Sequence, residues 1–334
     1  MASRPQPLLS GEDLAAAAVA FDELPRLPAV LEQLGFAVVT GVVIPEEVTA
    51  LKQRFSDAVV ELVDEEAVRA SGPTVQEVYE TLKQEGAGSL PRRTARALSR
   101  EGFCFRRCLA HSGFAWEVRQ DARVRAAWEA VYPGEPLVVS SDVTFFACDS
   151  EGTSVSDHLS AHVDQNKWDS KGFHAERPTY QGILYVQEAG EKTSSTVVWP
   201  RSHRAVWEQM MEDEAFERMG RVGVHYCQVT SVINGPLQRE LTQGWLDHAR
   251  RVPVPPGGLL LWNSRTVHTG WRGGPRLAQA VCFEPAAWRT EAQRLAKHRL
   301  AALGLPSTHW AHVGMQHDMA LSDLGVFRRG ATAV

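Results

Sequence analysis

A histidine and an aspartate stand two residues apart in the segment Ala161-His162-Val163-Asp164. On an extended strand alternate residues point to the same face, so His162 and Asp164 are expected to project together while Val163 faces the other way. One imidazole nitrogen and one carboxylate oxygen are then offered side by side. Two histidines and one carboxylate on one face of the metal are the ligands of non-haem iron(II) oxygenases, which keep positions open for substrate and dioxygen. The pair therefore predicts two ligands of such a centre.

The best candidate for the third ligand is His268. It follows an apolar stretch at 259–263, which comes directly after the turn sequence 255–258, and it precedes Gly270. A histidine at the exit of a strand can reach the mouth of a barrel, although a lone histidine is more often structural. We therefore predict that His162, Asp164 and His268 are the metal ligands and the catalytic centre.

Arg276 lies eight residues after His268, beyond the turn at 273–275. If 277–284 is a strand, small side chains share the face of Arg276 and mostly bulky side chains occupy the other face. Small inward side chains leave volume for a ligand, and a guanidinium binds a carboxylate through two parallel N–H groups. We predict that Arg276 binds the distal carboxylate of a dicarboxylate co-substrate. A surface salt bridge is the alternative role, and Arg272 is a second candidate for the same contact.

Candidates for substrate contacts are weaker, because each is also explained as a core or surface residue. One set follows the His-x-Asp motif directly and can line the mouth of the site: Asn166, Lys167 and Trp168. A second set can supply aromatic walls: Tyr185, Trp199 and Trp271. This mixture of polar and aromatic groups suits a medium-sized metabolite.

Other metal-binding interpretations are less well supported. Cys104, Cys108 and His111 form half of a zinc site, but no second cysteine pair at suitable spacing completes it. His158 precedes His162 by four residues, a spacing that binds zinc on a helix, whereas the residues around both histidines favour an extended chain. The C-terminal histidines lack regular spacing and are predicted to lie on the surface: His309, His312 and His317.

Composition limits the function classes. The chain of 334 residues is 44% hydrophobic and contains 10 tryptophans, so a folded core is expected. Its net charge of -5 disfavours a general nucleic-acid binder. Five scattered cysteines do not suit a disulfide framework, and no signal peptide or run of 18 apolar residues is present. We expect a cytoplasmic protein that acts on a small molecule without binding a membrane.

The elements that must position these residues change in character at Pro136. Before it, helices are predicted at 11–20 (capped by Ser10), 26–35, 45–64, 75–85, 93–101 and 116–130, with one strand at 35–43. After it, strands are predicted at 137–147, 158–164, 181–188, 194–199, 224–230, 258–263 and 277–284, and helices at 203–220, 236–250 and 286–303. This pattern predicts a mostly β core, a barrel or sandwich, with a helical wrapper.

We predict one domain over 1–334. It comprises a mainly helical part at 1–135, a β core at 136–285 with a helical insert at 203–250, and a C-terminal helical segment at 286–334.

Four stretches together resemble the phytanoyl-CoA dioxygenase-like group of Fe(II)/2-oxoglutarate oxygenases. They are 34–48, the motif at 162–164, the pair 182–186 and 195–203, and the segment from 254 through His268 to Arg276. The resemblance implies a double-stranded β-helix, a jelly-roll or cupin-like barrel. It implies iron(II) on His162, Asp164 and His268, 2-oxoglutarate on Arg276, and dioxygen as the oxidant. His203 is structural by the same resemblance, and Ser202 is predicted to cap the following helix.

Two departures from the family pattern concern the co-substrate. Ala278 stands where the family often has a serine that shares the distal carboxylate, and the spacing from His268 to Arg276 is short. Asp164, by contrast, favours hydroxylation, because halogenating relatives replace this carboxylate with a small residue. We therefore expect a dioxygenase that hydroxylates an aliphatic carbon of a small or medium-sized metabolite. The alternatives are a metal-dependent cupin-type enzyme that does not use 2-oxoglutarate and a non-catalytic binding module.

Overall fold

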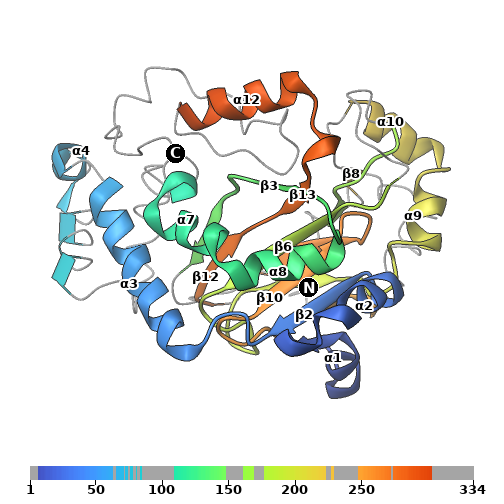
Figure 1. Ribbon diagram of the computed structural model, residues 1–334, viewed down its shortest axis with the longest axis horizontal. Coiled ribbons are helices and arrows are strands. Elements are labelled where there is room, and N and C mark those ends of the chain that lie inside the picture. The colour runs from blue at the N-terminus through green and yellow to red at the C-terminus, as the bar shows by residue number, and fades with distance from the viewer. Residues whose placement is uncertain are drawn as a thin grey trace.

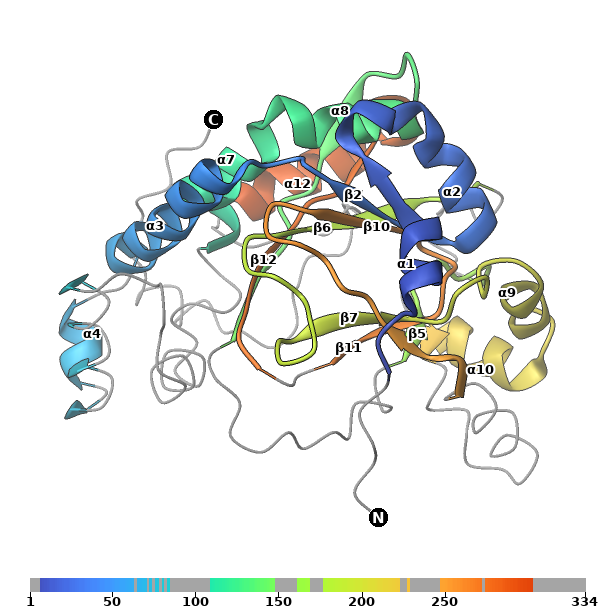
Figure 2. The ribbon, with the colours of Figure 1, turned by 90° about the horizontal axis from the view of Figure 1, so that it is seen from below.

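The strands of the protein form two sheets that face each other, as the two layers in Figure 2 show. The computed structural model describes residues 7–62, 65–70, 72–73, 76–77, 80, 83–84, 109–147, 161–168, 177–222, 227–228, 247–271 and 274–302. In order across the larger sheet lie β1 (Ala18–Ala20), β2 (Phe36–Thr40), β10 (Leu259–Asn263), β6 (Tyr180–Tyr185), β12 (Arg276–Ala280) and β4 (Thr144–Ala147). Across the smaller sheet lie β8 (Cys227–Gln228), β5 (His162–Val163), β11 (His268–Trp271), β7 (Ser195–Val198) and β9 (Arg250–Arg251).

Successive strands alternate between the two sheets. The chain passes from β4 in the larger sheet to β5 in the smaller one, then to β6, β7, and later β10, β11 and β12 in the same alternation. Apart from the parallel pair β1–β2, the paired strands of these two sheets are antiparallel. This is a double-stranded β-helix, as predicted. A short pair, β3 (Leu137–Val139) with β13 (Phe283–Pro285), extends one end.

Helices cover the outer face of the larger sheet. Figure 1 and Figure 2 place α2 (Leu27–Leu34), α3 (Pro45–Leu62), α7 (Gly113–Gln120), α8 (Ala122–Val131) and α12 (Glu291–Ala302) on this side. The fit is close at Gly182, where an added Cβ would lie 2.8 Å from the Trp128 ring and 2.8 Å from the Val281 carbonyl oxygen. Glycine therefore lets α8 pack against the middle of the sheet.

A second hydrophobic cluster lies on the outer face of the smaller sheet. It joins residues of β5, β7 and β11 to the helices α9 (Ala205–Met210) and α10 (Glu214–Val222), with Val163, Val197, Trp199, Trp207, Met210, Cys227 and Trp271 among its members. Further helical segments include α1 (Gly11–Ala17), α4 (Glu65–Ala70) and the 3-10 turns Phe21–Arg26, Leu109–His111 and Ala286–Trp288. Within these described ranges, no helix is long and apolar enough to span a membrane.

Several predicted elements divide in the structure. The alanine-rich helix, capped by Ser10 as predicted, ends at Ala17, because 18–20 pair with β2 and bury Val19. The predicted strands at 137–147 and 277–284 each break into two, since β3–β13 and β4–β12 are separate pairings.

The predicted helices at 116–130 and 203–220 also break into two. They break at Asp121 and near Asp213, whose carboxylates cap the second helix of each pair. The predicted helix at 93–101 and most of those at 75–85 and 236–250 lie outside the described residues.

Candidate metal centre and co-substrate site

The three predicted metal ligands meet between neighbouring strands of the smaller sheet. His162 of β5 is paired directly with His268 of β11, and Asp164 follows β5. One possible ligand atom from each residue lies within 4.8 Å of the other two. The His162 Nε2 atom is 3.5 Å from Asp164 Oδ1, and the His268 Nε2 atom is 3.3 Å from Asp164 Oδ2. Val163 points into the outer cluster, as the alternation predicted.

Backbone hydrogen bonds hold this group in place. The Asp164 N–H donates to the Ser264 carbonyl at 2.8 Å. The His268 Nδ1 atom lies 3.0 Å from the Thr266 carbonyl oxygen. Since a carbonyl can only accept, the Nδ1–H group donates this bond, and Nε2 is the ring nitrogen that faces Asp164. His268 begins β11 rather than ending β10, because residues 264–267 form the turn between the two strands.

The chemistry of this group fits a metal ion. The His268 Nε2 atom lies 3.3 Å from Asp164 Oδ2. A neutral imidazole nitrogen and a carboxylate oxygen can each donate a lone pair to a metal, so a cation bound between them would stabilise the arrangement. Two imidazole nitrogens and one carboxylate oxygen are also the donor set that iron(II) oxygenases use.

Arg276 begins β12 and faces the interior between the sheets. Its Nη2 atom donates to the Tyr185 hydroxyl at 3.1 Å, and its guanidinium carbon lies 4.6 Å from the centre of the Phe145 ring. Its Nε atom is buried and has no hydrogen-bond partner in the part of the chain that the structure describes. Ala278 and Ala280 are buried on the same face, as the alternation predicted. An arginine with an unsatisfied buried N–H fits a carboxylate ligand.

Two hydroxyl groups lie beside Arg276 where Ala278 supplies none. The Tyr185 hydroxyl is 2.9 Å from the Thr196 hydroxyl, and Arg276 Nη2 is 3.5 Å from the latter. Tyr185 belongs to the larger sheet and Thr196 to the smaller one, so this contact joins the two sheets beside the arginine. Thr196 was not among the predicted site residues. It lies two residues before Val198 in β7, on the same face of the strand, and Val198 pairs with His268.

The other predicted substrate contacts divide into three groups. Asn166 is buried, and its side-chain oxygen accepts from the Trp168 N–H at 3.0 Å, so it shapes the turn after the motif. Lys167 is exposed, and its Nζ atom lies 5.1 Å from the centre of the half-buried Trp168 ring. Tyr185 is fully buried beside Arg276.

The structure does not bring Trp199 and Trp271 to the triad. Both pack in the outer cluster, on the face of the smaller sheet opposite His268. The spacing explains this placement, because Trp271 is three residues after His268 in one strand and odd offsets point to opposite faces.

Three interior residues near the triad were missed by sequence reasoning. The side-chain amide of Gln181 donates to Asp164 Oδ2 at 2.5 Å, and the Trp262 ring centre is 5.1 Å from that of His268. Asp142 is buried, and burial, aided by the nearby Asp164 charge, raises its pKa to about 6 against the opposing hydrogen bond from Val143. The only signal for Gln181 was a polar residue within an otherwise apolar strand.

The turn that precedes α9 differs from its prediction in one respect. The Ser202 hydroxyl donates to the Trp199 carbonyl at 2.7 Å and accepts from the Val267 N–H at 2.9 Å. It therefore braces the turn before His268 and does not cap the helix, whose N-cap residue is Arg204. The His203 Nε2 atom lies 3.0 Å from the Glu32 carbonyl oxygen, a structural contact with α2.

Few of the remaining candidates can be placed. His111 is buried in the 3-10 turn before α7. The others lie outside the described residues: Cys104, Cys108, His158, Arg272, His309, His312 and His317.

Comparison with known proteins gives one family match. The family model described as phytanoyl-CoA dioxygenase (PhyH) matches residues 31–273. No curated protein matches the chain.

Similar solved structures include the hypothetical protein JW0805 from Escherichia coli, with a TM-score of 0.51 at 12% identity over 86% of this chain and 75% of that one. HygX from Streptomyces hygroscopicus, solved with nickel, 2-oxoglutarate and hygromycin B, has a TM-score of 0.44 at 16% identity over 77% and 86%. The epimerase SnoN, solved with Fe3+, alpha ketoglutarate and nogalamycin RO, has a TM-score of 0.40 at 14% identity over 79% and 84%.

Proposed function

Because the chain belongs to the phytanoyl-CoA dioxygenase family, we propose that it hydroxylates an aliphatic carbon of a small or medium-sized metabolite between its two sheets. Family membership makes it a non-haem iron(II) oxygenase that uses 2-oxoglutarate and dioxygen. The observation that carries the proposal is the convergence of His162, Asp164 and His268, whose ligand atoms lie within 4.8 Å of one another.

The metal would be held by these three side chains on one face. Iron(II) bound there supplies the oxidising chemistry: with dioxygen, 2-oxoglutarate becomes succinate and carbon dioxide, and a substrate hydrogen is replaced by a hydroxyl group. The chain's own residues bind and orient the reactants. The Thr266 carbonyl keeps the proton of His268 on Nδ1, so that Nε2 is available as a ligand.

Arg276 would hold the distal carboxylate of 2-oxoglutarate. Its buried Nε atom lacks a partner among the described residues, and the hydroxyls of Tyr185 and Thr196 lie beside its Nη2 atom. The two hydroxyls share one hydrogen bond, so one O–H group remains that can donate to the same carboxylate in place of the serine that Ala278 replaces. A half-buried arginine with a neighbouring hydroxyl donor favours a carboxylate over a neutral ligand.

The experiment adds iron(II) and 2-oxoglutarate to the protein without oxygen and measures the weak visible charge-transfer band of the iron–2-oxoglutarate chelate. We expect a band in the unaltered protein, no band in His162→Ala, and at least a 10-fold higher 2-oxoglutarate requirement in Arg276→Met. Arg251→Met is the matched control, since its guanidinium also lies over an aromatic ring, 4.1 Å from the centre of Trp271, but on the outer face.

Each contrary outcome favours one alternative. Bound iron without a band would contradict the 2-oxoglutarate assignment and favour another metal-dependent cupin-type reaction. A protein that binds no iron would instead be a binding module. An Arg276→Met variant that behaves like Arg251→Met would place the co-substrate contact elsewhere.

A further inference from the structure

Gln181 and Trp262 are paired across neighbouring strands of the larger sheet, opposite the triad. Gln181 lies in β6 and Trp262 in β10, and the two residues are direct partners in the antiparallel register. Figure 2 shows β6 and β10 side by side in the layer that faces β5 and β11. Tyr185 has the same parity in β6 as Gln181 and reaches Thr196 of the smaller sheet, so this face of β6 is the interior face.

The Gln181 amide makes a short contact with the metal-ligand carboxylate. Its Nε2 atom lies 2.5 Å from Asp164 Oδ2. A carboxylate can only accept, so the amide must present its NH2 group, and a hydrogen bond to a charged acceptor is among the stronger ones. With Oδ2 held by the amide and lying 3.3 Å from His268 Nε2, Oδ1 faces His162 Nε2 at 3.5 Å, so the bond fixes how the carboxylate is turned toward both histidines.

Trp262 lies in the same sheet as Gln181 and packs against His268, the neighbouring member of the triad. Its ring is buried, with its centre 5.1 Å from that of the His268 ring and an angle of 52° between the two planes. His268 is thus confined between this ring and the Thr266 carbonyl that accepts from its Nδ1 atom. The carboxylate and the imidazole are each held by a residue that is not itself a ligand.

We propose that Gln181 is a positioning residue that fixes the Asp164 carboxylate in its orientation for metal binding, with Trp262 steadying His268 beside it. This inference rests on the proposed function, because it assumes that the triad holds a metal. A carboxylate that is already oriented by a hydrogen bond binds the ion more tightly than one that must first be ordered.

The test uses cobalt(II) as the probe, because its visible absorption reports coordination number directly and needs no turnover. Gln181→Met keeps the chain length but removes the donor. We expect the cobalt(II) Kd to rise about 10-fold to 100-fold, the usual cost of losing a residue that hydrogen-bonds to a metal ligand, and the visible bands to change because the carboxylate loses its fixed orientation. Gln181→Asn keeps the amide on a side chain that is one methylene shorter, so its Kd and spectrum should be intermediate.

Gln279 provides the matched control. It is a fully buried glutamine of the adjacent strand β12, and its amide bonds to Thr144 Oγ1 at 2.6 Å and to the backbone carbonyl of Asp142 at 3.1 Å, and among the described residues it makes no hydrogen bond to a side chain of the triad. Gln279→Met should lower the midpoint of thermal unfolding but leave the cobalt(II) Kd and spectrum unchanged.

The outcomes separate this inference from the proposed function. If Gln181→Met or Gln181→Asn lowers thermal stability while the Kd and spectrum stay as in the unaltered protein, Gln181 is only structural and the inference is overturned. If Gln181→Met does not fold, the Gln181→Asn spectrum decides by the same criterion. If the unaltered protein binds cobalt(II) no better than His162→Ala, the proposed metal centre itself fails.

Discussion

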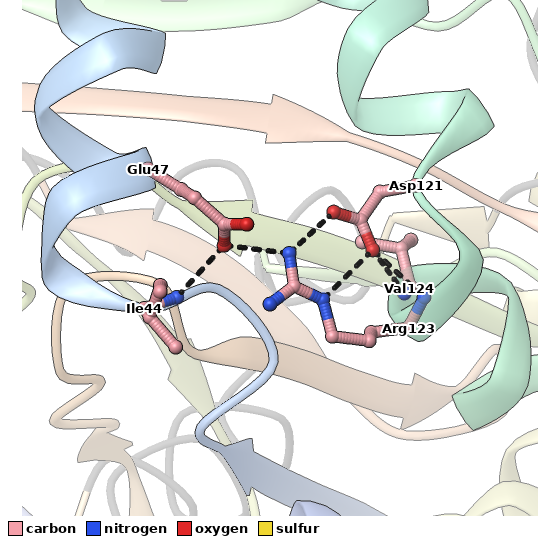
Figure 3. Close-up of polar contacts among 5 residues, drawn as sticks. All are labelled: Ile44, Glu47, Asp121, Arg123 and Val124. Atoms are coloured by element: carbon pink, nitrogen blue, oxygen red, sulfur yellow. Dashed lines mark hydrogen bonds and ion pairs between the residues drawn. The ribbon is translucent and has the colours of Figure 1, made fainter.

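Carboxylate oxygens contact side-chain nitrogens in two regions of this molecule, and the two sets of contacts differ in chemistry. Between α3 and α8, Glu47 and Asp121 surround Arg123 on the outside of the protein, as Figure 3 shows. We call these three residues the helix clamp. Between β5 and β11, Asp164 faces two imidazole nitrogens and the Gln181 amide in the interior. The clamp carboxylates contact a permanent cation, whereas Asp164 contacts two imidazole nitrogens and an amide nitrogen.

The difference lies in what the neighbours do with the oxygen lone pairs. In the clamp, Arg123 Nη2 donates to Glu47 at 2.6 Å and to Asp121 at 2.9 Å, and Asp121 also accepts from the backbone N–H groups of Arg123 and Val124. These donors satisfy the carboxylates without help from outside. At the triad, two imidazole nitrogens and a carboxylate oxygen converge, which is the donor set of an iron(II) site. A self-sufficient cluster stabilises the fold, whereas we propose that the convergent one binds a metal.

The largest expected effect separates the two regions by metal binding. Asp164→Asn should raise the Kd for iron(II) or cobalt(II) by at least about 100-fold, because losing a metal ligand should cost more than losing a residue that hydrogen-bonds to a ligand. Asp121→Asn, the same chemical change in the clamp, should leave the Kd unchanged. Both are measured by anaerobic titration. Equal Kd values for Asp164→Asn and the unaltered protein would break the comparison.

The next largest effect concerns the helix clamp, where a substitution should lower stability but leave metal binding unchanged. Asp121→Ala removes the N-cap of α8, where the carboxylate accepts from Arg123 N at 2.7 Å and Val124 N at 3.2 Å. We expect the free energy of unfolding to fall by about 1 kcal/mol, the typical cost of losing such a cap. Urea unfolding of the metal-free protein measures it. A loss of metal affinity in this variant would show that the clamp and the triad are coupled.

A smaller effect is the pH dependence of the clamp. Burial alone would raise the pKa of Asp121, but hydrogen bonds from the Arg123 side chain and from two backbone N–H groups outweigh it and lower the pKa below its usual 3.8. A depressed carboxyl pKa contributes stability that is present above the unfolded-state pKa and lost as pH falls through the folded-state value. The stability difference between the unaltered protein and Asp121→Asn should therefore be constant near neutrality and shrink below about pH 4. A difference that grows on acidification would reverse this assignment.

The sequence predicted much of the fold and of the triad, for a physical reason visible in the residues. Strand alternation places His162 and Asp164 on the face opposite Val163, and Arg276 on the face of Ala278, and the structure has both arrangements. These are local consequences of a period of two. The division of residues 137–147 and 277–284 into separate strands could not be predicted, because it depends on which distant strands pair.

Contacts across the sheets were also beyond the sequence. Gln181 reaches Asp164 from the opposite sheet, and the Tyr185 hydroxyl reaches Thr196 in the same way. Nothing in the spacing of these residues links them. Trp271 was predicted as an aromatic wall of the site but packs in the outer cluster, and its odd offset from His268 within one strand already indicated the outer face.

The smallest effect sharpens the comparison inside the clamp itself. The Glu47–Arg123 contact spans 2.6 Å, but the two side chains are 44% and 30% exposed, so water and salt screen it. A double-mutant cycle with Glu47→Gln and Arg123→Met should give a coupling free energy of about 0.2–1 kcal/mol, which declines as salt is raised. Glu47 also accepts from the Ile44 N–H at 3.2 Å, a bond that Glu47→Gln can keep, so the cycle isolates the ion pair from the cap of α3. Coupling that persists undiminished in high salt would mean that the clamp behaves as a buried pair, and the contrast drawn with the interior site would then rest on donor chemistry alone.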